Sequence, residues 1–206
     1  GCGVYDGAEI HEATLTLLAI SKFGCNYEIF APDVNQAHVI NHLTGEVMQE
    51  ARNVLVESAR IARGKIKNLK DFSAKEFDSI VFPGGFGAAK NLSIYAFAGE
   101  KLIVIPEVEK AVREMYALRK PIAALCIAPV IIAKILGNVK VTIGNDPGTA
   151  ADINKFGATH INTDYKGVAI DKENLIFTTP CYMLGTSIAE VAEGAENIIK
   201  AIIEYC

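Results

Sequence analysis

The chain has 206 residues, with 20 basic and 24 acidic side chains and a formal net charge of −4. Half of the residues are hydrophobic, which excludes a disordered chain, and the slight acidity gives no electrostatic basis for binding nucleic acid or an anionic membrane. The length predicts one domain spanning residues 1–206.

The cysteines and the N-terminal residues indicate the compartment. The cysteine number is odd and the spacings are wide, which is typical of free thiols in a reducing compartment. No apolar run is long enough to span a membrane, and the opening GCGVYDGAEIHE lacks the features of a signal peptide. We therefore expect a cytoplasmic protein without a membrane segment. The five cysteines are Cys2, Cys25, Cys126, Cys181 and Cys206.

Short apolar runs alternate along the chain with stretches of helical periodicity. Strands are predicted at residues 27–31, 79–82, 121–125, 139–143 and 175–178. Helices are predicted at residues 9–23, 48–63, 106–119, 127–136 and 186–204, and a capping box at 73–76 predicts a short additional helix. This alternation predicts an open, mostly parallel α/β sheet with helices on both faces.

Functional sites in such sheets form beyond the carboxyl ends of the strands. This rule selects three loops: the opening GCGVYDGAE, PGGFGAAKN after Phe82, and CIAP after Leu125. The opening loop has the wrong spacing for a dinucleotide fingerprint, and PGGFGAAKN is not a phosphate-binding loop.

Cys126 lies between an apolar strand and a helix that begins at once, which is the setting of a nucleophile elbow. The partial positive charge of a helix N-terminus favours a thiolate there. The alternative is a buried, inert cysteine.

Two further features have both a functional and a structural interpretation. The glycines after Phe82 could supply N–H groups to an oxyanion pocket, or they could only form a tight turn. Glu9 begins the first helix and could act on the nucleophile, although a carboxylate at this place more often caps the helix.

Three segments together resemble the ThiJ/PfpI superfamily, which has a glutamine-amidotransferase-like fold. They are GCGVYDGAEIHE, PGGFGAAKNLS and AALCIAP. Further segments, including RNVLVESARIARG and TTPCYM, are similar to its ElbB branch, glyoxalase ElbB or isoprenoid-biosynthesis protein with amidotransferase-like domain. The resemblance covers nearly the whole chain and implies a flavodoxin-like three-layer α/β sandwich. It also implies that a first strand of the family is absent before Gly1, which would leave apolar surface exposed.

The resemblance implies a role for four residues. Cys126 matches the nucleophile, and Glu9 matches the glutamate that reaches it from the first helix. Gly85 and Ile127 match the positions whose N–H groups line the oxyanion pocket. A protonated Glu9 is expected to lower the pKa of Cys126.

The implied activity is a slow, glutathione-independent conversion of glyoxal-type dicarbonyls to hydroxy acids, without metal or organic cofactor. The expected partners are a small dicarbonyl substrate and, by analogy, a second copy of the chain; nucleic acid and membranes are not expected. Ile127 replaces the histidine of the peptidases of this superfamily, which disfavours proteolysis. A cysteine-based redox sensor and a non-catalytic regulatory or interaction protein are the alternatives.

Overall fold

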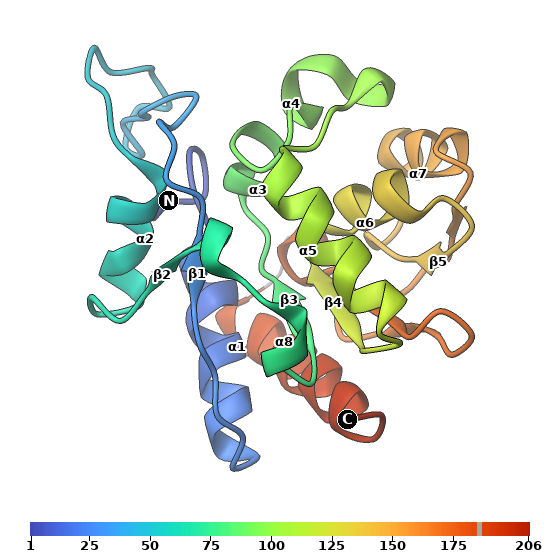
Figure 1. Ribbon diagram of the computed structural model, residues 1–206. Coiled ribbons are helices and arrows are strands. Elements are labelled where there is room, and N and C mark those ends of the chain that lie inside the picture. The colour runs from blue at the N-terminus through green and yellow to red at the C-terminus, as the bar shows by residue number, and fades with distance from the viewer. Residues whose placement is uncertain (185–186) are drawn as a thin grey trace.

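The computed structural model describes residues 1–184 and 187–206 (Figure 1). Its central sheet has the strand order β3-β4-β8-β7, in which β3, β4 and β8 are parallel and β7 is an antiparallel edge. These strands are β3 (Ile80–Phe82), β4 (Ile122–Leu125), β7 (Ala169–Asp171) and β8 (Ile176–Thr179).

Two short parallel pairs accompany this sheet. One consists of β1 (Phe30–Ala31) and β2 (Lys67–Asn68), and the other of β5 (Lys140–Val141) and β6 (Thr159–His160). A largely apolar cavity of about 870 Å³ lies between β1 and β3, with walls that include α1 and α8. Cys126 and Glu12 do not line this cavity.

Helices cover both faces of the central sheet. One face carries α1 (Ile10–Lys22) and α8 (Ile188–Ile203), and the other carries α5 (Pro106–Ala117) and α6 (Pro129–Leu136).

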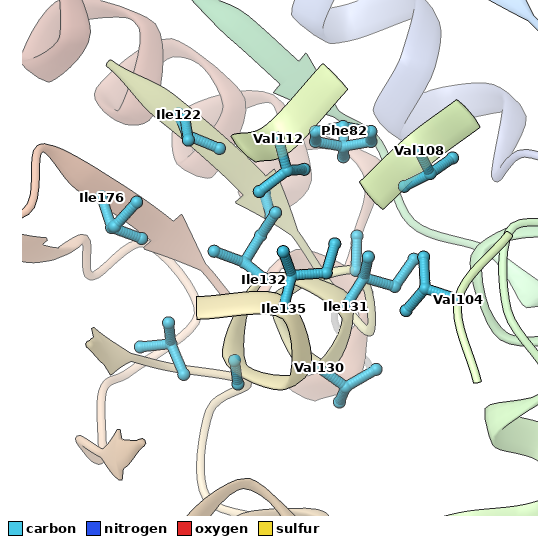
Figure 2. Packing of buried hydrophobic residues seen from close by; sticks show 14 of the residues in the cluster. Phe82, Val104, Val108, Val112, Ile122, Val130, Ile131, Ile132, Ile135 and Ile176 are labelled. Carbon is cyan, nitrogen blue, oxygen red and sulfur yellow. The ribbon is translucent and has the colours of Figure 1, made fainter. Parts of the chain in front are cut away.

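Strand β4 shows how the two layers are separated. Ile122 and Ala124 contact the α5–α6 layer, whereas Ala123 and Leu125 belong to the cluster with α8. Figure 2 shows Ile122 among residues of the first cluster, including Val112 from α5 and Ile132 from α6. All four β4 side chains are buried, as expected for a strand covered on both faces. The predicted three-layer α/β fold is confirmed.

The remaining elements are short. The other helices are α2 (Val54–Ile61), α3 (Phe86–Lys90), α4 (Tyr95–Ala98) and α7 (Pro147–Lys155). Turns of 3₁₀ helix cover Leu69–Asp71, Ala74–Glu76, Gly99–Lys101 and Cys181–Leu184. Within the described residues, no helix is both long and apolar enough to cross a membrane.

Some predicted element boundaries were wrong. The helix predicted at 48–63 begins only at Val54, because the side chain of Asn53 accepts the N–H of Val56 and caps it. The segment after Ser73 is a 3₁₀ turn, and the Ser73 side chain makes no capping bond. The last helix begins at Ile188; Thr186, the predicted start, lies outside the described residues.

Candidate active site

The predicted elbow is present at Cys126. This residue directly follows β4 and has a φ of +58°, a left-handed conformation that non-glycine residues seldom adopt. Its N–H donates to the carbonyl of Thr179 at the end of β8, with an N···O distance of 2.9 Å. The neighbouring strand therefore holds the strained residue in place, as is common at functional sites.

The carboxyl group at the Cys126 sulfur belongs to Glu12. The Glu12 side chain is hydrogen-bonded to the Cys126 thiol and is wholly buried. Its Oε2 accepts the N–H of Gly84 at 3.0 Å, and its Oε1 accepts the N–H of Tyr182 at 3.1 Å. The first turn of α1, the loop after β3 and the turn after β8 therefore meet at one carboxyl group.

The structure thus puts Glu12 in the place that the resemblance implied for Glu9. Glu9 is the N-cap of α1, and its Oε2 accepts the N–H of Glu12 at 2.6 Å. The capping interpretation of Glu9 is therefore confirmed, and its carboxylate satisfies a free N–H of the first turn. The spacing of the buried positions Glu12, Thr16 and Ala19 marks the inner face of α1 and was the signal that could have identified Glu12.

The two residues predicted to line an oxyanion pocket both lie at the sulfur. The backbone N–H groups of Gly85 and Ile127 donate to the Cys126 Sγ. Gly85 has a φ of +91°, which favours glycine, and a Cβ at this position would clash with the backbone nitrogen of Glu9. Two converging N–H donors beside a nucleophile can stabilise negative charge on the sulfur or on an attacked carbonyl oxygen.

Burial raises the pKa of Glu12 from its ordinary value of 4.5 to about 7, and the nearby charge of Glu9 acts in the same direction. The N–H groups of Tyr182 and Gly84 oppose this rise because they stabilise the carboxylate. A carboxyl group with a pKa near 7 is well placed to accept and return a proton at neutral pH.

The pKa of Cys126 differs from the expectation. Burial raises it well above the ordinary value, and the adjacent carboxylate of Glu12 raises it further. The N–H groups of Gly85 and Ile127 lower it but do not reverse the direction. The prediction of a lowered thiol pKa was therefore wrong, because these two N–H groups do not outweigh desolvation beside a carboxylate. Cys126 is therefore a thiol at neutral pH, and it donates to the Glu12 carboxylate once Glu12 has lost its proton.

A second pair of side chains lies at the rim of the site. The His11 Nδ1 and the Tyr182 hydroxyl are 2.7 Å apart, and the Glu9 Oε1 lies 4.0 Å from the same nitrogen. This pair could not be predicted from the sequence, because the two residues lie 171 positions apart and only the fold brings them together. Within the described part of the chain, no group of three or more His, Cys, Asp or Glu side chains could hold a metal ion.

The sequence and the fold have known relatives. A rat protein, ES1 protein homolog, mitochondrial, is 45% identical over 99% of this chain and 80% of its own length. A human protein, glutamine amidotransferase-like class 1 domain-containing protein 3, mitochondrial, has the same identity and coverage. The crystal structure of an isoprenoid biosynthesis protein with amidotransferase-like domain from Ehrlichia chaffeensis superposes with a TM-score of 0.93. It is 39% identical and covers 100% of this chain and 96% of its own.

These relatives correct one expectation. The cysteine pattern and the N-terminal residues predicted a cytoplasmic protein, but the rat and human relatives are both described as mitochondrial. The cytoplasmic prediction is therefore wrong. It depended on the absence of a targeting pattern in the printed residues, and such an absence does not fix a compartment.

The implied family is confirmed by a direct match. The model of the DJ-1/PfpI family matches residues 4–179, which include the elbow, the glycine loop and the first turn of α1. The chain belongs to the DJ-1/PfpI family.

Proposed function

We propose that this protein converts small dicarbonyls, such as glyoxal, into hydroxy acids, with Cys126 as the nucleophile and Glu12 as the general base. The observation that carries the proposal is the buried thiol–carboxyl hydrogen bond beside the two N–H groups of Gly85 and Ile127. This arrangement supplies a nucleophile, a proton acceptor and an anion-stabilising pocket within one small volume.

The reaction begins with addition. As the Cys126 sulfur attacks an aldehyde carbon, its proton passes to the Glu12 carboxylate, and the carbonyl oxygen becomes an alkoxide. The N–H groups of Gly85 and Ile127 hold this oxygen while the charge develops. Glu12 then returns the proton to the alkoxide, which gives a neutral hemithioacetal and regenerates the carboxylate.

The rearrangement uses the same base. Glu12 removes the C–H proton of the former aldehyde carbon, which gives an enediolate, and the hydroxyl proton moves from the oxygen of this carbon to the oxygen of its neighbour. Glu12 then returns the first proton to the neighbouring carbon. The product is a thioester of a hydroxy acid on Cys126. Water hydrolyses this thioester, and for glyoxal the products are glycolate and the free thiol. The sequence consumes one water and no external oxidant or reductant.

The structural environment of Cys126 disfavours the redox-sensor alternative. Sensor cysteines are exposed and have a low thiol pKa, because the thiolate is the form that peroxides oxidise. Cys126 is only 8% exposed, and both burial and Glu12 raise its pKa. A thiol that loses its proton only as it attacks a substrate suits turnover better than sensing.

The test is a product assay with glyoxal. We expect the wild-type protein to form glycolate, observed by proton NMR, and the Cys126→Ala variant to form none above the uncatalysed rate. Cys25→Ala is the matched control, because Cys25 is exposed and lies outside the site. Equal glycolate formation by Cys126→Ala, or none by the wild type, would overturn the proposal; the latter result would favour an interaction protein.

A further inference from the structure

The hydrogen bond between His11 and Tyr182 joins the two segments that hold Glu12. The two atoms are 2.7 Å apart, and the ring centroids are 5.8 Å apart. His11 directly precedes Glu12 in α1, and Tyr182 lies in the 3₁₀ turn after β8. His11 is exposed and Tyr182 is partly buried, so this bond lies at the rim of the site.

The backbone of Tyr182 makes a second bond between the same two segments. Its N–H donates to the Glu12 Oε1 at 3.1 Å, and this donor lowers the Glu12 pKa against the effect of burial. The side-chain bond at the rim and the backbone bond in the interior therefore restrain one turn at two points. If the outer bond is lost, the turn is free to move away from the carboxyl group.

We propose that His11 and Tyr182 form a latch that positions Glu12 for proton transfer with Cys126. Both are positioning residues, and neither needs to touch the substrate. The consequence for turnover rests on the proposed function, but the consequence for the proton affinity of the Glu12–Cys126 pair does not. A carboxylate that loses one of two backbone donors binds its proton more tightly.

The charged and titratable groups around Glu12 define what a variant must leave unchanged. Glu9 faces it from α1, Cys126 from the elbow, and Cys181 and Tyr182 from the turn after β8. Tyr182→Phe removes only a hydroxyl group and changes no formal charge at neutral pH. A shift in the titration of the pair can then be assigned to the lost hydrogen bond.

The experiment measures the rate at which iodoacetamide modifies Cys126, by site-resolved mass spectrometry across a pH series. The alkylation rate rises as the coupled pair loses its first proton, because part of the remaining population then carries the charge on sulfur. In Tyr182→Phe we expect the midpoint of this rise to move up by about half a pH unit. The reactive fraction of the pair should then be about twofold lower at the wild-type midpoint and about threefold lower well below it. The kcat profile for glyoxal should move in the same direction, with KM unchanged.

Tyr165→Phe is the matched control, because the Tyr165 hydroxyl bonds Glu193 on the surface at 3.3 Å. His11→Leu removes the other partner of this hydrogen bond and should give the same shift as Tyr182→Phe. His11→Gln should keep a largely wild-type profile, because glutamine retains an acceptor for the Tyr182 hydroxyl. The double variant of His11→Leu with Tyr182→Phe should shift no further than either single variant. An unchanged midpoint in both single variants, or the same shift in Tyr165→Phe, would overturn the latch. Alkylation of Cys126 needs no turnover. If the protein forms no glycolate, the proposed function is refuted, but the midpoint of the alkylation profile still tests the latch.

Discussion

Cys126 and Glu12 are buried and joined by a hydrogen bond, so they release their protons as a pair. Burial disfavours a second negative charge next to the first, and the pair therefore carries at most one negative charge near neutral pH. In this state the proton lies between the sulfur and the carboxyl group. The chemistry thus depends on moving one proton over one hydrogen bond rather than on a permanently ionised thiol.

The first prediction is the pH dependence of turnover. Glu12 must be ionised to accept the thiol proton, and its pKa is raised to about 7. We therefore expect kcat/KM for glyoxal to rise with increasing pH through about 7 and to fall about tenfold per unit below it. A rate that is flat from mildly acidic to neutral pH would contradict a base role for Glu12.

The second prediction separates the two glutamates. Glu12→Gln keeps the size of the side chain but removes the proton acceptor, so kcat should fall by about 10²-fold or more. The rise in Cys126 alkylation near pH 7, which reflects the raised pKa of Glu12, should also disappear. In this variant alkylation should begin only at more alkaline pH. Glu9→Gln is the control: its side chain keeps an oxygen for the N–H of Glu12, and kcat should fall far less. A larger loss in Glu9→Gln would return the role to Glu9.

Three elements create this site, and none of them contains it alone. The N–H of Glu9 donates to the carbonyl of Gly84 at 3.0 Å, which ties the start of α1 to the loop after β3. The N–H of Gly84 in turn donates to Glu12, and Cys126 approaches the same loop from β4. The close contact of these backbones leaves no space for a side chain at position 84.

The third prediction follows from this contact. A Cβ at position 84 would lie 2.5 Å from the Glu12 Oε2 and 2.9 Å from the Cys126 Sγ. We expect Gly84→Ala to displace the carboxyl group, reduce glycolate formation by about 10²-fold, and destabilise the fold by roughly 1–3 kcal/mol. Gly148→Ala is the control, because a Cβ there comes no closer than 3.5 Å to Asp146 and sits within α7. Circular dichroism should first establish that Gly84→Ala is folded. Full glycolate formation by this folded variant would refute the close packing of the loop.

Element patterns in the sequence explain both the successful and the failed site predictions. The elbow could be predicted because an all-apolar strand, a cysteine and a helix follow one another directly. Glu12 was missed because Glu9 and Glu12 lie three residues apart at one helix start, and only the N-cap role of Glu9 separates them. Helix α7 was missed although Asp146 and Pro147 are good start signals; the Asp146 side chain accepts the N–H of Thr149 at 2.7 Å.

At the scale of the whole molecule, the predictable part of the fold is its buried centre. Strands β3, β4 and β8 consist largely of apolar residues and were predicted within one or two positions. Strands β2 and β6 have only two residues each, which is too short for an alternation of apolar and polar residues to show. They are held in place by their parallel partners β1 and β5. Their pairing is a tertiary property that no local pattern encodes.

The last prediction concerns the stability of the whole protein as a function of pH. The pKa of Glu12 is about 7 in the folded protein and 4.5 when unperturbed, so between these values the folded state binds more protons than the unfolded state. The contribution of Glu12 to the free energy of unfolding therefore falls as pH rises through this window, by roughly 3 kcal/mol in total. Glu12→Gln removes this titration, although its amide loses one of the two backbone bonds at every pH. We thus expect the stability of Glu12→Gln relative to the wild type to increase by roughly 3 kcal/mol from below pH 4.5 to above pH 7, measured by urea unfolding. A relative stability of Glu12→Gln that stays constant with pH would mean that the Glu12 carboxyl group is not held in the low-dielectric setting from which its role as a base derives.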